Sequence, residues 1–190
     1  MTLQTARPMF TSARNTGEGW RDEYETPREL FQQLDALFRF DLDVCASAQN
    51  ALCPRFYTEA DDGLRQRWAP WVSWCNPPYS SAGAWVRKAW HEAQRGAVVV
   101  VLVPPRTDAA WWHEWAMRAD RLVLLEGRVQ FTLGGKRPLD GKGKPSSNQH
   151  PSSLLVFDPF GQFAQVEIGR PGPRVSGWDW KAAPEPDVRP

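Results

Sequence analysis

The sequence predicts an α/β domain built on a mainly parallel sheet, and two observations support this. Residues 98–103 form an unbroken run of valine and leucine without polar alternation, which is typical of a strand buried on both faces at the centre of a parallel sheet. Segments with helical spacing of apolar residues, at 26–38, 81–95 and 108–118, alternate along the chain with strand-like segments. This alternation is the pattern of an α/β fold.

The first helix has clear start signals. Thr26 is expected to be the N-cap, Pro27 to occupy the first helical position, and Glu29 to complete a capping box. The apolar face of this helix consists of five residues at helical spacing: Leu30, Phe31, Leu34, Leu37 and Phe38. The second helix, at 81–95, is expected to stop at Gly96.

Short apolar or alternating runs predict the remaining strands. In chain order they are residues 40–45, 55–57, 71–75, 98–103, 122–125, 129–131 and 154–157, with 165–168 as a candidate for a further one. The chain is expected to form a flexible arm at 1–19, one domain at 20–169 and an extended Pro-rich tail at 170–190. Within the domain, residues 134–150 are rich in breakers and predict a mobile basic loop.

Composition limits the possible functions. The formal net charge is +1, so no global basic field indicates nucleic-acid binding, and any such contact must come from local patches. The three cysteines (Cys45, Cys53 and Cys75) show no metal-binding or paired spacing, and they predict reduced thiols in a cytoplasmic protein. The three histidines are far apart, so no metal site is expected. The apolar run at 97–103 is too short to span a membrane.

The motif Asn76-Pro77-Pro78-Tyr79 follows the predicted strand 71–75. In open α/β sheets, ligands bind at the carboxyl ends of the strands. The Asn76 amide oxygen and the Pro77 carbonyl can each accept one hydrogen from an exocyclic amine, Pro78 has no N–H to compete, and Tyr79 can stack on a flat ring. The motif therefore predicts a site for an amino-bearing heterocycle. The alternative is a proline turn that ends a strand.

Two further segments fall where a cofactor site would need them. Asp43 ends the first strand and is followed by the small residues Ala46 and Ser47, so its carboxylate could bind a ribose hydroxyl or an amine. A G-x-G-x-x-G fingerprint is absent. Asp62 lies in an Asp-Asp-Gly-Leu segment that could equally be a solvated turn.

Taken together and in this order, several segments resemble one family, the phage-type (Dam-like) DNA N6-adenine methyltransferases. They cover most of the chain, from about residue 20 to 159. In chain order they are ETP at 25–27, DLDVCAS at 41–47, DDGL at 61–64, NPPY at 76–79, PRTD at 105–108, EGRVQF at 126–131 and PSS at 151–153. The NPPY segment is shared by amino-group methyltransferases in general. The segments around Arg106 and Arg128 are specific for this family.

The resemblance implies a Rossmann-like methyltransferase fold with S-adenosylmethionine as methyl donor and no metal. It also implies that the cofactor is bound by residues near the first helix and strand: Tyr24, Thr26, Pro27, Asp43, Ala46 and Asp62. Only about thirty residues separate Asp43 from Asn76, too few for two full helix–strand units, so the sheet is expected to be trimmed between them.

The implied substrate is double-stranded DNA, from which the adenine is flipped out of the stack. Six cations are candidates for DNA contact: Arg106, Arg128, Lys136, Arg137, Lys142 and Lys144. For the two arginines the alternative is a structural ion pair, with Asp108 or Glu126. The chain is expected to be a monomer or weak dimer, in the bacterial host cytoplasm if it is phage-encoded. Three other substrates use the same motif, namely RNA adenine, cytosine N4 and protein glutamine, and a catalytically silent DNA-binding module is a further alternative.

Overall fold

Strand β4 (Val98–Val103) lies in the middle of a seven-stranded sheet with the order β2-β1-β3-β4-β6-β5-β7. The fold is known from a computed structural model, which describes residues 24–139, 150–168 and 175–178. All six residues of β4 are buried, as expected for a central strand covered on both faces. The prediction of a buried central strand at 98–103 is confirmed.

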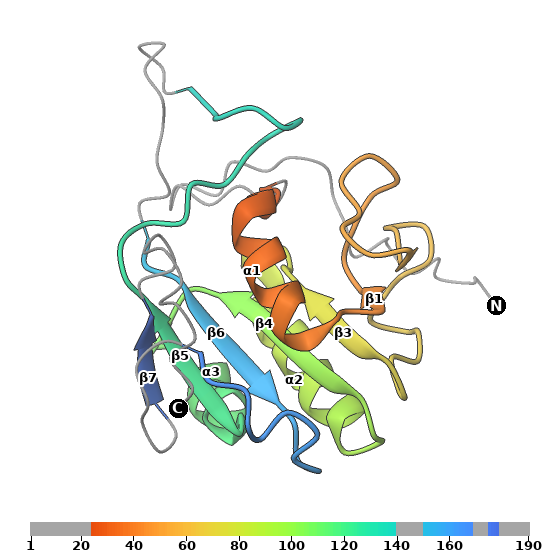
Figure 1. The fold of residues 1–190 in the computed structure, drawn as a ribbon, viewed down its shortest axis with the longest axis vertical. Coiled ribbons are helices and arrows are strands. Elements are labelled where there is room, and N and C mark those ends of the chain that lie inside the picture. Colours follow the sequence, from red (N-terminus) through yellow and green to blue (C-terminus); the bar gives the residue numbers. More distant parts are fainter. Residues whose placement is uncertain (1–23, 140–149, 169–174, 179–190) are drawn as a thin grey trace, which may run out of the picture.

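The sheet is mainly parallel. The other strands are β1 (Leu42–Asp43), β2 (Arg55–Phe56), β3 (Val72–Cys75), β5 (Arg121–Leu125), β6 (Ser153–Phe157) and β7 (Val175–Trp178). Strands β2, β1, β3 and β4 pair in parallel, β6 is antiparallel to both β4 and β5, and β5 pairs in parallel with β7. Because β6 alone is reversed, the carboxyl ends of β1, β3, β4 and β5 lie at the same edge of the sheet (Figure 1).

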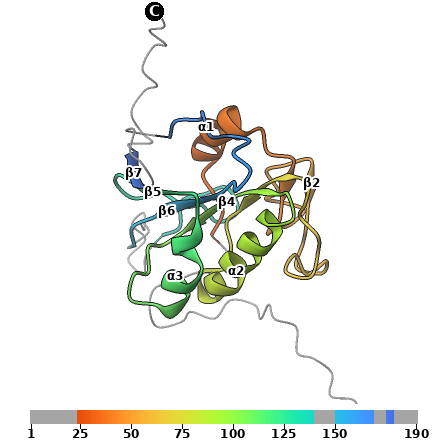
Figure 2. The ribbon, with the colours of Figure 1, turned by 90° about the horizontal axis from the view of Figure 1, so that it is seen from below.

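Helices cover both faces of this sheet. Helix α1 (Arg28–Phe38) lies on one face, and α2 (Ala82–Ala93) and α3 (Ala110–Glu114) lie on the other (Figure 2). Short 3₁₀ turns, η1 (Tyr79–Ser81) and η2 (Ala116–Arg118), precede α2 and follow α3. Within the described part of the chain, no helix is long and apolar enough to cross a membrane.

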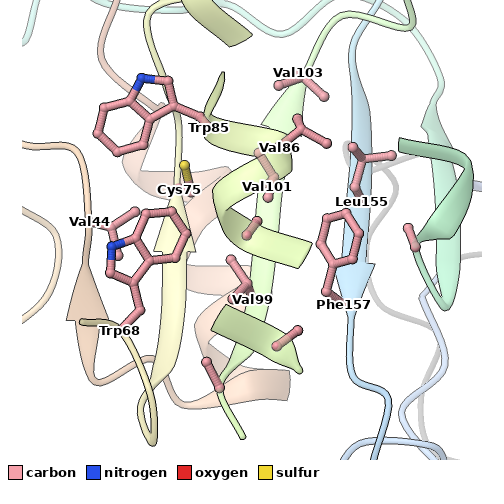
Figure 3. Packing of buried hydrophobic residues seen from close by; sticks show 14 of the residues in the cluster. Val44, Trp68, Cys75, Trp85, Val86, Val99, Val101, Val103, Leu155 and Phe157 are labelled. Atoms are coloured by element: carbon pink, nitrogen blue, oxygen red, sulfur yellow. The ribbon is translucent and has the colours of Figure 1, made fainter. Parts of the chain in front are cut away.

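Alternate residues of β4 belong to two separate cores. Val99, Val101 and Val103 pack on the α2 side together with Trp68 and Trp85 (Figure 3). Val100 and Leu102 pack on the α1 side with the apolar face of that helix. Four tryptophans are buried in these cores and contribute large side chains to their packing: Trp68, Trp74, Trp85 and Trp112.

Helix α1 starts later than predicted. Pro27 is the N-cap, with an extended ψ of 129°, and no side chain caps the helix. The prediction that Thr26 is the N-cap was wrong, because the preceding Glu25 pairs as an extended bridge with Thr132 and keeps this stretch of backbone out of the helix. The predicted helix at 108–118 is also broken: Trp115, at φ −123° and ψ −47°, separates α3 from η2.

Two of the predicted strands are absent. Residues 129–131 form no strand, and the neighbouring Thr132 makes only the isolated bridge to Glu25. Residues 165–168 are also not a strand, because side chains bind this loop. The Arg121 guanidinium donates to the carbonyls of Phe163 and Val166, and the Asp158 carboxylate accepts the Phe163 N–H.

The sheet extends beyond residue 169. Strand β7 lies in the segment that we expected to be only an extended tail, and it pairs in parallel with β5. Between β1 and β3, by contrast, the chain holds only the two-residue strand β2 and several turns, without a helix. The sheet is therefore short on this side, as the spacing between Asp43 and Asn76 predicts.

Candidate active site

The Asn76-Pro77-Pro78-Tyr79 corner follows the carboxyl end of β3 directly and leads through η1 into α2. Pro77 and Pro78 are buried, so the corner is fixed by packing as well as by its restricted backbone. The Asn76 Nδ2 group donates a hydrogen bond of 3.0 Å to the carbonyl oxygen of Tyr24. Because the amide nitrogen is engaged in this bond, its orientation is set, and Oδ1 is the acceptor directed away from Tyr24.

Three aromatic rings lie next to this corner. Tyr24 stacks on Phe131 with a centroid distance of 5.5 Å and an angle of 8° between the planes. Tyr79 meets the same Phe131 ring edge-on, at 5.9 Å and 83°. Burial raises the pKa of the Tyr79 phenol, and a hydrogen bond with Ser152 opposes that shift. The phenol is therefore neutral, and the ring is positioned by its edge-on contact with Phe131.

A pocket of about 1050 Å³ opens between the end of β1, the loop at 57–62 and the corner. Two of the predicted cofactor residues, Ala46 and Asp62, line it together with Pro78. A smaller pocket of about 60 Å³ adjoins it, and four further predicted residues line that space: Tyr24, Thr26, Asp43 and Asn76. The two pockets share Glu25, Cys45 and Asn50 in their walls. Pro27 lines neither pocket and serves as the N-cap of α1.

Asp62 projects a carboxylate oxygen into the wall of the large pocket. Its Oδ2 lies 3.4 Å from Nε of the exposed Arg65, whereas its Oδ1 is buried and has no hydrogen-bond partner within the described residues. A buried carboxylate oxygen without a partner costs free energy, on the order of 1–3 kcal/mol. Because Asp62 lines the large pocket, its carboxylate is a candidate acceptor for a ligand donor.

Gly63 explains how Asp62 comes to this position. A Cβ atom built on Gly63 would lie 2.2 Å from the carbonyl oxygen of Val44 and 3.1 Å from the Trp85 ring. Only a glycine lets the loop press this closely against the end of β1. Asp62 itself has a left-handed φ of 52°, a conformation that aspartate tolerates better than most residues. The Asp-Gly pair is therefore a structural requirement of this pocket rather than an ordinary solvated turn.

Asp43 is almost fully buried at the end of β1. Its carboxylate accepts hydrogen bonds from the backbone N–H groups of Cys45 (3.3 Å) and Leu52 (3.2 Å). Burial raises the pKa of Asp43 to about 6, and these two hydrogen bonds only partly oppose the effect. A pKa near neutrality, in a carboxylate beside a cavity, is typical of functional sites.

Sequence reasoning missed several pocket residues. Glu25, Ser47, Asn50 and the turn at 133–134 line the large pocket, and no role was predicted for them. Ser47 and Asn50 hold a turn, since the Ser47 N–H donates to Asn50 Oδ1 at 2.6 Å and the Asn50 N–H donates to Ser47 Oγ at 3.3 Å. Ser47 directly follows Ala46, which was a usable signal for it, whereas Glu25 had none because its partners lie more than a hundred residues along the chain.

The described candidate cations lie at the same sheet edge as Asn76. Arg106 follows β4, and its guanidinium pairs with both carboxylate oxygens of Asp108, at 3.0 and 3.1 Å. For Arg106, the ion pair with Asp108 that was the alternative to DNA contact is present, and contact with DNA stays a prediction. Arg128 follows β5 and is exposed, and Lys136 and Arg137 are exposed on the next turn. Lys142 and Lys144 lie outside the described residues, as does most of the predicted loop 134–150.

Comparison with known proteins gives the family. A family model described as DNA N-6-adenine-methyltransferase (Dam) matches residues 13–174, which include the corner, both pockets and the described cations. The chain belongs to this family. The Dam match confirms the resemblance that the order of the sequence segments indicates.

Two phage proteins of this name are similar to the chain. A DNA N-6-adenine-methyltransferase of Escherichia phage T1 is 30% identical over 123 residues, which are 64% of this chain and 52% of the relative. One of Haemophilus phage HP1 (strain HP1c1) is 25% identical over 157 residues, which are 80% of this chain and 88% of the relative. The chain thus spans about half the length of the T1 relative and most of the HP1 relative. Within the described residues, no group of three or more His, Cys, Asp or Glu could hold a metal ion.

Proposed function

We propose that this chain is a DNA adenine N6-methyltransferase, which transfers a methyl group from S-adenosylmethionine on a Rossmann-like fold. The observation that carries the proposal is the Asn76 amide. The amide nitrogen donates a hydrogen bond to the Tyr24 carbonyl oxygen, and Asn76 lines a small pocket that adjoins the larger one. Membership of the Dam family and the printed names of the phage relatives support adenine in DNA as the substrate.

The large pocket suits the proposed cofactor. Its volume of about 1050 Å³ is at the upper end of the range for small-molecule sites. The Asp62 carboxylate, in the wall of this pocket, would supply an acceptor for an N–H donor such as the amine of the cofactor's adenine. The Asp43 carboxylate, in the adjoining pocket, favours a cationic or hydroxyl-bearing group such as the amino-acid or ribose part. Ala46 keeps the wall close to the ligand because its side chain is short.

The chain's own residues would act on the amine of the target base. Asn76 Oδ1 and the Pro77 carbonyl would accept its two hydrogens, which draws the lone pair out of the ring and onto the nitrogen. The cofactor, when bound, supplies a methyl group attached to a sulfonium. Transfer of that methyl would leave a neutral thioether and a methylated amine, whose extra proton would pass to solvent. No covalent enzyme intermediate is needed, so positioning and electrostatics supply the acceleration.

Tyr79 would stack on the flipped base. Base–aromatic stacking contributes roughly 1–3 kcal/mol per base, which offsets part of the cost of unstacking the base from the duplex. The edge-on contact with Phe131 holds the Tyr79 ring beside Asn76. The ring therefore need not be ordered when the base arrives, which favours binding.

Double-stranded DNA would lie against the edge that carries the corner. Arg128, Lys136 and Arg137 are exposed there, and Arg106 presents its pair with Asp108 at the same edge. Contacts of these cations with phosphates would make affinity fall steeply with salt. We also propose contacts for Lys142 and Lys144, a monomer or weak dimer as the active form, and action in the cytoplasm of the bacterial host.

A methyl-transfer assay tests the proposal. Purified protein is incubated with S-adenosylmethionine labelled on the methyl group and with double-stranded DNA, and the nucleosides are then separated. We expect label in N6-methyladenine. The same reaction with RNA, and analysis for N4-methylcytosine, distinguishes the other substrates of such a motif. Folded protein that binds the cofactor but leaves adenine unlabelled would refute the assignment.

Asn76→Ala is the first variant to test. Loss of one preorganised hydrogen-bonding group at a reacting centre typically costs about 100-fold or more in kcat. We expect that loss, with binding of S-adenosylhomocysteine changed by less than about threefold, because Asn76 contacts the target base in this mechanism and not the cofactor's adenine. Calorimetry and single-turnover methylation measure the two effects separately. A variant with full activity would contradict the role of Asn76.

A further inference from the structure

Glu25 makes an unusual set of hydrogen bonds at the mouth of the large pocket. Its Oε1 accepts the N–H of Gly134 at 3.1 Å, and its Oε2 accepts the N–H of Gly135 at 2.9 Å and the Thr132 hydroxyl at 3.1 Å. Two successive backbone N–H groups directed at one anion form a nest for that anion. A single carboxylate, more than a hundred residues away in the chain, therefore binds the whole turn.

The turn itself is a tight hairpin. Leu133 and Lys136 exchange two backbone hydrogen bonds of 2.8 and 3.1 Å, and Gly134 and Gly135 have φ values of 56° and 72°. Positive φ at both central residues is the geometry of a type I′ turn, which glycine adopts without strain. Glu25 also exchanges two backbone hydrogen bonds with Thr132, at 2.9 and 3.1 Å. The hairpin is thus joined to Glu25 through both backbone and side chain.

The same short segment reaches the catalytic corner. The Tyr24 carbonyl accepts the Asn76 amide hydrogen, and the Tyr24 ring stacks on Phe131, which directly precedes Thr132. Glu25, Leu133 and Gly134 all line the large pocket. The hairpin also carries Lys136, and Arg137 follows it, both exposed. Residues 24 and 25 therefore connect the pocket wall, the orientation of the Asn76 amide and two candidate DNA-binding cations.

We propose that Glu25 is a positioning residue that fixes the hairpin 133–136 as a wall of the cofactor pocket and thereby couples cofactor binding to DNA binding. This inference rests on the proposed function. A ligand in the large pocket contacts the wall that Glu25 holds, so it stabilises the position of the hairpin from which Lys136 and Arg137 reach DNA. By linkage, DNA bound to those cations increases cofactor affinity by the same factor.

The first test needs no ligand. Hydrogen–deuterium exchange of peptides covering residues 132–137 is compared in the wild type, Glu25→Ala, Glu25→Gln and the control Glu29→Gln. Glu29 is an exposed acidic residue on the first turn of α1 and lines neither pocket. Since hydrogen bonds to a charged group are stronger than those between neutral groups, we expect exchange in Glu25→Ala to be faster by roughly tenfold or more. Glu25→Gln should be intermediate, and Glu29→Gln unchanged.

The second test measures coupling. The dissociation constant of S-adenosylhomocysteine is determined by calorimetry with and without a DNA duplex, in the same four proteins. In the wild type we expect duplex DNA to tighten cofactor binding by about fivefold or more, within the usual range of coupling. In Glu25→Ala this factor should fall towards one. Thermal unfolding is recorded in parallel, because a residue that only stabilises the fold would lower Tm without changing the coupling factor.

The outcomes separate the inference from the proposed function. If the wild type binds no cofactor, the proposed function fails, and the coupling role of Glu25 fails with it. If the wild type binds and methylates but Glu25→Ala keeps both hairpin protection and the coupling factor, only the inference is overturned. Faster hairpin exchange without any change in coupling would also overturn it, since Glu25 would then hold the turn without serving the site.

Discussion

At the scale of single residues, polar groups at the site are placed by bonds to backbone rather than to other side chains. The Asn76 amide is oriented by the Tyr24 carbonyl, and the Asp43 carboxylate by the N–H groups of Cys45 and Leu52. Asp62 differs, because one of its oxygens is buried without a hydrogen-bond partner among the described residues. Among the single residues of the site, Asp62 is therefore the one that we most expect to accept a hydrogen bond from a ligand.

Two substitutions of Asp62 test whether this oxygen accepts a ligand hydrogen. Asp62→Asn keeps an acceptor and tolerates the left-handed backbone, so cofactor affinity should change by less than about threefold. Asp62→Ala removes the acceptor and should weaken S-adenosylhomocysteine binding by roughly tenfold or more. Calorimetry measures both. Equal affinity in the alanine variant and the wild type would show that Asp62 Oδ1 does not contact the cofactor.

Asp43 predicts a pH dependence of cofactor affinity. Burial raises its pKa to about 6, so the carboxylate gains a proton as the pH falls through about 6. A cationic cofactor favours the ionised form, and affinity should therefore weaken below pH 6, by up to about tenfold per pH unit. Asp43→Asn should flatten this profile. Affinity that stays constant from pH 5 to pH 8 in the wild type would contradict a direct role for the carboxylate.

At the scale of elements, the close approach of the 57–63 loop to β1 forms one side of the large pocket. Gly63→Ala would place a Cβ atom 2.2 Å from the Val44 carbonyl oxygen, which lies in backbone and cannot move aside. Such overpacking typically costs about 1–3 kcal/mol and would also shift Asp62. We expect lower stability in urea unfolding together with weaker cofactor binding. Unchanged values for both would show that the loop adapts freely.

Elements with strong local signals could be predicted from sequence, and those set by distant contacts could not. The valine run at 98–103 predicts β4, and the short apolar run before Asn76 predicts β3, because strands buried in the sheet consist of apolar residues. The start of α1 was misplaced because Thr26 is held by the bridge of Glu25 to Thr132, a partner far along the chain. Arg121 and Asp158 likewise prevent a strand at 165–168.

The residues of the site follow the same rule: those in local motifs could be predicted from the sequence, and those placed by distant contacts could not. The corner and the cofactor residues Asp43, Ala46 and Asp62 have local motifs. The structure places these three residues, Asn76 and Pro78 on the two adjoining pockets, whereas Pro77 and Tyr79 line neither pocket. The role of Glu25 had no local signal, because its partners at 132–135 are brought to it only by the fold. The turn at Gly134 and Gly135 lies at the start of the loop predicted at 134–150, and nothing in the sequence indicated that it lines a pocket.

At the scale of the whole molecule, two buried carboxylates act on stability in opposite directions. Asp43 has a pKa of about 6 when folded, against 3.8 in a free chain, so the unfolded chain releases its proton first as pH rises. Its ionisation therefore removes about 3 kcal/mol of stability between about pH 4 and pH 6. A bound cofactor cation would offset this cost. Without cofactor, we therefore expect the unfavourable contribution of Asp43 to the stability of the fold to be largest at neutral pH.

Glu92 acts in the opposite sense. Burial alone would raise its pKa, but hydrogen bonds from Lys88, from the Trp68 and Ala69 N–H groups and from Arg95 lower it to about 2. Its contribution to stability is present above pH 4.5 and is lost as the pH falls towards 2. Glu92 joins α2 to the loop before β3, and β3 leads into the Asn76–Tyr79 corner.

Glu92→Gln should therefore destabilise the protein at pH 7 by about 3 kcal/mol, since it leaves Lys88 without its buried counter-ion. The difference from wild type should shrink as the pH falls from 4.5 towards 2. Urea unfolding at several pH values measures this, with Glu114→Gln, at an exposed helix position, as the matched control. A difference that is independent of pH would show that Glu92 acts through packing alone.

The central claim is that the Asn76 corner methylates adenine in DNA, and one measurement tests it most directly. The wild-type chain and Asn76→Ala are expressed in a bacterial host without adenine methyltransferases, and the genomic DNA is read by nanopore sequencing. We predict N6-methyladenine within a defined short sequence in cells with the wild-type chain, and none with Asn76→Ala at equal protein levels. Unmodified adenines in both, or equal modification in both, would contradict the claim.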